Sequence, residues 1–294
     1  MKLILSEKGE KRLLLIPTII VLALFTTLPY VMTFILGLFN YDAANPAANR
    51  FIGLRNYGEA LADPRFWNSL LVTAKFVIAS VSIELIFGLG IALLFKGLPK
   101  GRGIFQSILL VPMVVPPIVV GLNWKLLLDP NYGVINWIFS VLRVPQQVWL
   151  SDPQSAIFAL ALVDVWQYTP FVALLSLAIL VALPSDPYEA AILDGANPIQ
   201  VLFKITIPLM RSGLTIIIML RLIECFKDFA KIYTLTSGGP GIATETLNFY
   251  VYLNAFENYK LGYSSALAII LFSIIILFSI ILIRGANKKD GGKL

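Results

Sequence analysis

The sequence contains no histidine and a single cysteine. The absence of histidine excludes a Ser-His-Asp triad, a histidine-containing zinc site and a histidine proton relay. Cys225 cannot form an intramolecular disulfide, so cysteine usage does not indicate the redox compartment. No Gly-x-x-x-x-Gly-Lys-Ser/Thr segment is present, which excludes ATP binding through a P-loop of this chain. Without a catalytic constellation or a metal-ligand cluster, we expect neither an enzyme nor a metal site.

Charged residues are also scarce, at 14% of the chain, whereas hydrophobic residues make up 58%. A soluble domain typically has about 25% charged and roughly 45–50% apolar residues. Several apolar runs reach the length of about 20 residues that a transmembrane helix needs. The chain is therefore predicted to be an all-α integral membrane protein. Its formal net charge of +6 does not indicate a nucleic-acid-binding face, because the basic residues lie at the ends of the apolar runs.

About six transmembrane helices are predicted, and the first apolar run is too long for the 7–15-residue core of a signal peptide. The predicted spans are residues 13–39, 66–95, 103–124, 155–183, 212–236 and 261–283. The third contains Pro112, Pro116 and Pro117, which remove helical hydrogen bonds, so we expect a broken helix facing protein or a cavity. The predicted organisation is an N-terminal segment, a transmembrane domain and a C-terminal tail: residues 1–12, 13–284 and 285–294.

The distribution of Lys and Arg predicts the orientation, because cytoplasmic loops carry the excess of basic residues. An even number of spans places both termini on one side. The basic residues predicted on that side are Lys2, Lys8, Lys11, Arg12, Lys96, Lys100, Arg102, Lys204, Arg211, Arg284, Lys288, Lys289 and Lys293. Those predicted on the opposite side are Arg50, Arg55, Arg65, Arg143 and Lys260. Both termini and the polar segment before the fifth span are therefore predicted to be cytoplasmic.

The fifth span is unusually charged, and its charges fall within an arc of roughly 120° on a helix. They are Arg221, Glu224, Lys227, Asp228 and Lys231. Lipid cannot cover this arc, because each charge costs several kcal/mol near the bilayer centre. One interpretation is structural: Arg221 pairs with Glu224, and Asp228 pairs with Lys231, at i,i+3 spacing. Three charges in other spans are expected to pair between helices: Lys75, Glu84 and Asp164.

The other interpretation is that the outer part of this arc lines a path for a polar solute. Carboxylates, amides and amines exchange hydrogen bonds with sugar hydroxyls, and an aromatic ring stacks on the sugar face. The candidate residues are Asp228, Lys227, Tyr233, Trp166 and Asn123. Structural pairing and path lining are compatible with each other.

A polar segment, residues 184–211, lies between the fourth and fifth spans. Prolines and capping side chains at its start fit the first turn of a helix, and Gly195 is placed to end that helix. A second short helix is predicted at residues 198–206, ended by Pro208. The two helices would form a compact projection with a face of small side chains, which permits close approach by a partner. The alternative is an ordinary amphipathic helix resting on lipid headgroups.

The spacing of Glu189-Ala190-Ala191, Asp194-Gly195 and Pro208 resembles the cytoplasmic EAA loop of ATP-binding-cassette (ABC) importer permeases. Further segments resemble the carbohydrate-uptake branch of that family, which includes maltose and glycerol-phosphate importers, and together they cover nearly the whole chain. These are Phe-x-Gly-Leu-x-Asn-Tyr at 51–57, Trp-x-x-x-Pro-Phe at 166–171, Thr-x-Gly-Gly-Pro at 236–240 and Leu-Gly-Tyr-Ser-Ser-Ala at 261–266.

The resemblance implies a type I importer permease in a bacterial-type inner membrane, with a cytoplasmic coupling loop. It also implies four kinds of partner: a second related permease, two ATPase subunits, an extracytoplasmic solute-binding protein and the lipid bilayer. ATP and magnesium would be bound by the ATPases, so no cofactor is expected on this chain. The residues implied to couple to the ATPase are Glu189, Ala190, Ala191, Asp194, Gly195, Ala196 and Pro208.

The expected function is translocation of a sugar or related polar solute into the cytoplasm, and the motifs do not identify the solute. One alternative is a secondary transporter driven by an ion gradient, with a titrating buried carboxylate such as Glu84 or Asp164. Another is a membrane-embedded enzyme, which would need a nucleophile, a base or a metal cluster at workable spacing.

Overall fold

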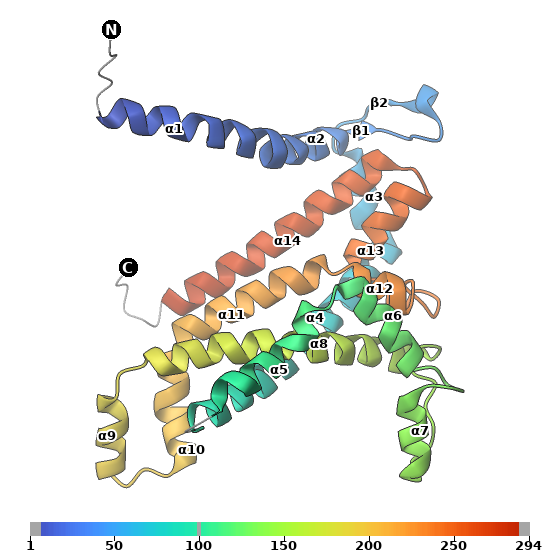
Figure 1. Cartoon of the computed structure of the whole chain (residues 1–294). Coiled ribbons are helices and arrows are strands. Elements are labelled where there is room, and N and C mark those ends of the chain that lie inside the picture. Colours follow the sequence, from blue (N-terminus) through green and yellow to red (C-terminus); the bar gives the residue numbers. More distant parts are fainter. Residues whose placement is uncertain (1–6, 99–100, 288–294) are drawn as a thin grey trace. The chain divides into compact units, whose positions relative to one another are not determined.

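The structure is a computed structural model that describes residues 7–98 and 101–287, and almost every element is a helix (Figure 1). Several basic residues of the predicted cytoplasmic set lie outside these ranges: Lys2, Lys100, Lys288, Lys289 and Lys293. The chain divides into two compact units. Unit 1 consists of Met1–Asp63 and Val251–Phe272, and unit 2 consists of Pro64–Tyr250 and Ser273–Leu294.

Unit 1 contains the first span and a loop folded back onto its end. Its elements are α1 (Glu7–Leu22), a π-turn (Ala23–Thr27), α2 (Leu28–Leu36), the antiparallel pair β1 (Phe39–Asn40) and β2 (Arg50–Phe51) around a 3-10 turn (Pro46–Ala48), α3 (Arg55–Ala62), a π-turn (Leu253–Glu257) and the first part of α14 (Leu261–Asn287). The buried amide of Asn56 donates hydrogen bonds to the carbonyls of Gly37 and Phe39, both at 2.9 Å. Tyr263 donates to Asp63 at 3.0 Å. The segment 51–57 is therefore tied to the end of the first span.

Unit 2 contains the remaining helices. They are α4 (Pro64–Lys96), α5 (Arg102–Val114), α6 (Pro117–Leu127), α7 (Val134–Val141), α8 (Pro153–Ala182), α9 (Asp186–Leu193), α10 (Pro198–Val201), a π-turn (Leu202–Thr206), α11 (Ile207–Lys227), α12 (Ala230–Leu235), most of α13 (Leu247–Tyr252) and the second part of α14. The two longest, α4 and α8, pack closely because Gly88 carries no side chain: a Cβ there would come 2.6 Å from Val172. An apolar cluster of Ala92, Leu177, Leu180 and Met210 joins α11 to this pair.

Hydrogen bonds from polar side chains shape the connection from α6 to α8. The carboxylate of Asp129 accepts from the backbone amides of Tyr132 and Asn131, both at 2.9 Å, and these donors hold the pKa of Asp129 below its ordinary value. Asn136, on α7, is buried and accepts from the indole of Trp149 at 3.0 Å. These bonds shape the turn before α7 and tie the first turn of α7 to the segment that leads into α8.

The Thr-x-Gly-Gly-Pro turn is also built from local hydrogen bonds. The hydroxyl of Thr244 donates to the carbonyl of Gly239 at 2.7 Å. The next residue, Glu245, is buried and accepts from the guanidinium of Arg65 at 2.8 and 2.6 Å. Because Arg65 lies in the first turn of α4, this ion pair anchors the turn to the start of the second span.

Two of the described π-turns have the same relation to a proline. The turn at Ala23–Thr27 ends two residues before Pro29, and the turn at Leu202–Thr206 ends two residues before Pro208. Proline lacks the amide that would bond to the carbonyl four residues earlier. Widening the preceding turn lets the helix absorb this loss without breaking. The prediction that Pro208 ends a helix is therefore wrong, since the helix runs from Pro198 to Lys227.

The predicted spans are confirmed by length and composition, with one correction. Within the described residues, five helices are long and apolar enough to cross a membrane, at Leu15–Leu36, Pro64–Lys96, Pro153–Ala182, Pro198–Lys227 and Leu261–Gly285. A sixth candidate, Gly103–Val114 with Pro117–Leu127, is bent by 90°, as the prolines of the third span predict. The fifth span, however, ends at Lys227 because Asp228 has an extended backbone (φ −61°, ψ 124°). The predicted single helix at 212–236 is thus two helices.

Candidate functional site

Three features of unit 2 carry the candidate site: a helical hairpin, an aromatic cavity and a buried ionic cluster. The hairpin consists of α9, α10 and the turn between them. Gly195 makes the turn with φ +70°, in the left-handed region that favours glycine. The amides of Gly195 and Ala196 donate to the carbonyls of Ile192 and Ala191, at 3.1 and 2.9 Å. These bonds cap the end of α9 in the manner of a Schellman motif.

A second cap and two base contacts hold the hairpin in place. Asn197 and Gln200 form a reciprocal capping box at 2.9 Å, which starts α10. At the base, the hydroxyl of Tyr188 lies 3.3 Å from that of Thr206. The ammonium of Lys96, at the end of α4, lies 4.6 Å from the centre of the Tyr188 ring. The hairpin is therefore attached at its base to both α4 and the start of α11.

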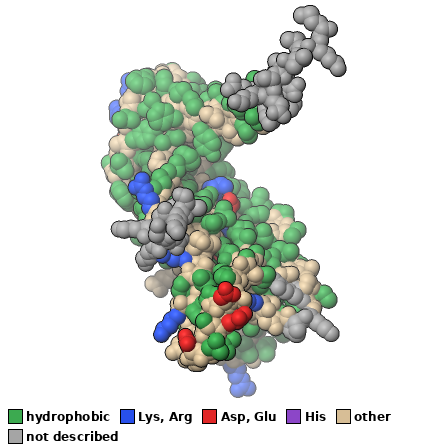
Figure 2. Space-filling view, turned by 90° about the vertical axis from the view of Figure 1, so that its left-hand side faces the viewer, with side chains coloured by type: hydrophobic (Ala, Val, Ile, Leu, Met, Phe, Trp, Pro, Cys, Tyr) green, Lys and Arg blue, Asp and Glu red, His purple; other side chains and the backbone are tan. Residues whose placement is uncertain are grey.

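Most of the predicted coupling residues are exposed on this hairpin. Glu189, Ala190, Asp194 and Gly195 are exposed, and Ala196 is half-buried. Pro208 is also exposed, but it lies beyond the hairpin in the first turn of α11. Figure 2 views the molecule from the side on which α9 lies in Figure 1 and shows acidic side chains gathered there.

Ala191 is an exception, because it is only 5% exposed. It packs inside the hairpin, and the expectation that it lies on the exposed small-residue face is corrected. Sequence reasoning also missed two apolar side chains at the tip, Ile192 and Leu193, which are 74% and 88% exposed. Their position at the end of α9, directly before the glycine turn, is the signal that could have identified them.

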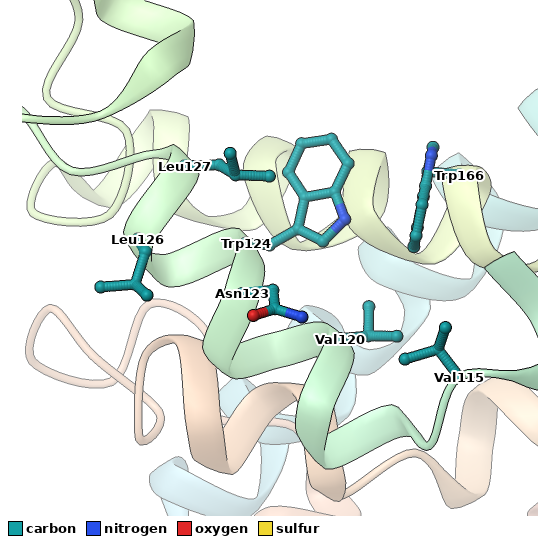
Figure 3. Close-up of a pocket in the computed structure, with 7 residues that line it drawn as sticks. All are labelled: Val115, Val120, Asn123, Trp124, Leu126, Leu127 and Trp166. Atoms are coloured by element: carbon teal, nitrogen blue, oxygen red, sulfur yellow. The ribbon is translucent and has the colours of Figure 1, made fainter.

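The aromatic cavity has a volume of about 450 Å³ and lies between α6, α8 and the bend before α6 (Figure 3). Its lining residues are Val115, Val120, Asn123, Trp124, Leu126, Leu127 and Trp166. The rings of Trp124 and Trp166 lie 5.6 Å apart with an interplanar angle of 68°. Asn123 supplies a side-chain amide beside these rings, and every lining residue is uncharged. Such a wall suits a ligand with both an apolar face and hydroxyl groups.

The ionic cluster lies at the meeting of α4, α8, α11 and α12. Arg221 donates to Glu84 at 2.6 and 2.8 Å and to Asp164 at 3.0 Å. Lys231 pairs with Asp164 and with Asp228, both at 2.8 Å. Arg221, Glu84, Asp164 and Lys231 are each at most 1% exposed. Three carboxylates and two cations thus form one continuous buried network.

Tyr168 lies against both cations of this network. Its ring centre is 4.0 Å from the Arg221 guanidinium carbon and 4.6 Å from the Lys231 ammonium. A smaller cavity of about 260 Å³ opens beside it. This charged cavity is lined by Pro117, Asp164, Tyr168, Arg221, Glu224, Lys227, Asp228, Phe229, Ala230 and Lys231.

The structure confirms some of the predicted pairs and corrects others. The pair of Asp228 with Lys231 is confirmed, as is interhelix pairing of Glu84 and Asp164. The predicted pair of Arg221 with Glu224 is wrong, because Glu224 is exposed and pairs with Lys227 at 3.3 Å. Lys75 was also expected to pair between helices. It is exposed on α4 and, among the described residues, no ion pair involves it.

The five predicted solute-path residues do not share one site. Asn123 and Trp166 line the aromatic cavity, whereas Asp228 and Lys227 line the charged cavity. Tyr233 lies on α12 with its ring stacked on Phe229, at a centroid distance of 5.4 Å. Trp124 was missed, although its aromatic side chain one residue after Asn123 is the kind of signal used for Trp166. The geometry separates an aromatic, uncharged cavity from a charged one.

Comparison with known proteins decides the family. The model of the family described as "Binding-protein-dependent transport system inner membrane component" matches residues 84–288. The chain belongs to this family. The trehalose/maltose transport system permease protein MalF of Thermococcus litoralis is 40% identical over 282 residues, covering 95% of the permease and 94% of that protein. The sulfoquinovosyl glycerol transport system permease protein SmoG of Agrobacterium fabrum is 32% identical over 278 residues, covering 95% and 90%.

A solved structure shows the same fold. The permease superposes on a chain of a bacterial alginate ABC transporter, crystallised with an alginate pentasaccharide-bound periplasmic protein, with a TM-score of 0.81 and 18% identity. The match covers 96% of both chains. The family and its relatives make the permease a multi-pass membrane subunit of an ABC importer, as the sequence predicts. Its family is one of transporter components, and its relatives do not support the ion-gradient or enzyme alternatives.

Proposed function

We propose that the permease forms the solute pathway of an ABC importer for a neutral sugar, with the aromatic cavity as the solute-contacting site. The observation that carries this proposal is the lining of that cavity by two nearly perpendicular indoles and one amide, without a charged side chain. An indole face stacks on a sugar ring, and an amide both donates to and accepts from hydroxyls. The names of the trehalose/maltose and sulfoquinovosyl glycerol permeases support a sugar as the solute class.

We further propose that the hairpin docks onto an ATPase subunit in the cytoplasm. In Figure 1, the hairpin and α7 lie at opposite ends of the long helices of unit 2, which supports exposure on opposite sides of the membrane. The positive-inside bias then assigns the hairpin and both termini to the cytoplasm. The exposed Glu189 would make the polar contact, and Ile192 and Leu193 would supply an apolar tip for the ATPase surface.

The proposed assembly contains a second related permease, two ATPases that bind ATP and magnesium, and an external solute-binding protein. ATPase closure would push the hairpin, and the hairpin would move α4 and α11 through its base contacts. The permease itself would bind no cofactor. Solute selection would be shared between the external protein and the aromatic cavity.

Uptake by the whole complex in proteoliposomes, with radiolabelled maltose and trehalose as probes, tests the cavity. Trp166→Ala should raise the KM for uptake by about tenfold, because a stacked ring contributes on the order of 1 kcal/mol or more. Trp137→Ala, which removes an exposed indole of α7, is the matched control and should leave uptake unchanged. Uptake of either sugar with an unchanged KM in Trp166→Ala and Trp124→Ala would contradict the assignment of the cavity. If the unsubstituted complex takes up neither maltose nor trehalose, these two sugars are excluded as solutes.

A further inference from the structure

Two helix breaks lie beside each other within unit 2. The first is the 90° bend between α5 and α6, where Val115 is extended (φ −70°, ψ 129°) before Pro116 and Pro117. The second is the break between α11 and α12 at Asp228. The packing of α6 on α12 brings the breaks together, since a Cβ on Gly121 would overlap the side chain of Thr234. Each break is a point at which one half of a helix can rotate relative to the other.

The side chain of Gln167 connects the two breaks. It lies on α8, is 1% exposed, and uses both ends of its amide. Its Nε2 donates to the carbonyl of Val115 at 3.0 Å. Its Oε1 accepts from the Lys231 ammonium, in the first turn of α12, at 3.4 Å. Gln167 thus supplies the carbonyl at the first break with a donor and the cation after the second break with an acceptor.

The two partners of Gln167 belong to different parts of the candidate site. Val115 lines the aromatic cavity, so its position helps to set the shape of that cavity. Lys231 belongs to the ionic cluster and is held by Asp164 and Asp228. Gln167 therefore bonds directly to the wall of the aromatic cavity, through Val115, and to the ionic cluster, through Lys231.

The chemistry of these two bonds requires a neutral amide. A carbonyl accepts and an ammonium donates, so the linking group needs a donor at one end and an acceptor at the other. Glutamate would still accept from Lys231, but it would place a carboxylate oxygen against the Val115 carbonyl. Methionine has nearly the same volume and makes neither bond. Both substitutions keep a side chain of similar size and remove the bond to Val115, and Gln167→Met adds no charge to the buried site.

We infer that Gln167 is a positioning residue that couples the shape of the aromatic cavity to the break between α11 and α12. When the α12 side moves in the transport cycle, the amide carries the movement to Val115, and cavity access changes with it. This inference rests on the proposed function, because it takes the aromatic cavity to be the solute site. Gln167 itself need not contact solute.

The test measures access to the cavity in the complete transport complex. Asn123→Cys places a thiol in the cavity wall, and Cys225, the native cysteine, is buried and expected to remain unlabelled. The rate of labelling by a water-soluble methanethiosulfonate is measured without nucleotide and with ATP plus vanadate. With Gln167 present, the two rates should differ by about fivefold or more. With Gln167→Met or Gln167→Glu, the difference should shrink to about twofold or less, while ATPase activity persists.

The matched control is Ser176→Ala, on the same helix. Ser176 is fully buried, and its hydroxyl has no hydrogen-bond partner among the described residues. The Ser176→Ala variant should show the same difference between the two labelling rates as the complex with Ser176 and Gln167 present. The inference is overturned if both Gln167 variants show the same nucleotide dependence of labelling as the control. It is also overturned if neither variant assembles into the complex. If the Asn123→Cys thiol is unlabelled in every state with Gln167 present, the proposed cavity itself is wrong, which is a distinct outcome.

Discussion

Arg221 of α11 donates two hydrogen bonds to Glu84 of α4, at 2.6 and 2.8 Å, and the two side chains are 1% and 0% exposed. These residues lie far apart in the sequence and join the second span to the fifth. Removing one partner of a buried pair leaves an uncompensated charge, which costs more than the pair contributes. The pair therefore specifies how α4 and α11 pack against each other.

Arg221→Met should destabilise the permease strongly. It leaves Glu84 and Asp164 buried without their shared cation, and breaking a buried pair in this way costs about 3–5 kcal/mol. The double variant Arg221→Met/Glu84→Met should recover part of that loss, because it replaces both charges with apolar volume. Thermal unfolding of the detergent-solubilised complex measures both. A double variant less stable than Arg221→Met would contradict the pairing.

Gly88→Leu should disrupt the packing of α4 on α8. A Cβ at Gly88 would lie 2.6 Å from the side chain of Val172, and overpacking of this kind costs about 1–3 kcal/mol. Gly90→Leu is the matched control on the same helix, because a Cβ there meets no atom within 4 Å. The thermal midpoint of the complex should fall for the first variant and stay unchanged for the second. Equal midpoints would contradict the close approach of the two helices.

Gly195→Asp should leave membrane insertion intact and abolish ATP hydrolysis coupled to transport. The substitution strains the left-handed turn and adds a charge at the joint of the hairpin. Gly195→Asn isolates the effect of the charge, because asparagine has nearly the same shape as aspartate and adopts the left-handed backbone without adding charge. We expect Gly195→Asn to retain most of the coupled hydrolysis, measured as ATPase activity stimulated by loaded binding protein. Normal transport by Gly195→Asp would remove the docking role from the hairpin.

The sequence predicts the elements that depend on local patterns. Apolar runs predict the spans, prolines predict the bend before α6, and Gly195 predicts the turn of the hairpin. These features depend on length, hydrogen-bonding capacity and backbone freedom, all of which are properties of short segments.

Partners between helices were harder to predict. Arg221 and Glu224 have the spacing of a pair within one helix, but Glu84 and Asp164 compete for Arg221 from neighbouring helices. A buried cation takes the partners that tertiary packing supplies, and one sequence does not contain that information. The break at Asp228 was missed for a related reason: no proline or glycine marks it. An ion pair with Lys231 accompanies it instead.

The solute site was predicted only in part. Aromatic and amide residues identified Asn123 and Trp166, and the structure places both in one cavity. Charge alone suggested Asp228 and Lys227, yet these line a different cavity beside the ionic cluster. Residue type predicts what a side chain can bind, whereas its location depends on how the helices pack.

Site-specific cross-linking from the hairpin tests the central claim most directly. In the assembled complex, a cysteine introduced by Ala190→Cys should cross-link to the ATPase subunit, with a yield that changes on ATP binding. Ala190 is exposed on α9, and the native Cys225 is buried, so the introduced thiol is the reactive one. In right-side-out vesicles, a membrane-impermeant maleimide should leave the new thiol unlabelled until the membrane is opened. Labelling from the outer face, with no ATPase cross-link, would contradict the proposal that the hairpin is the cytoplasmic coupling element.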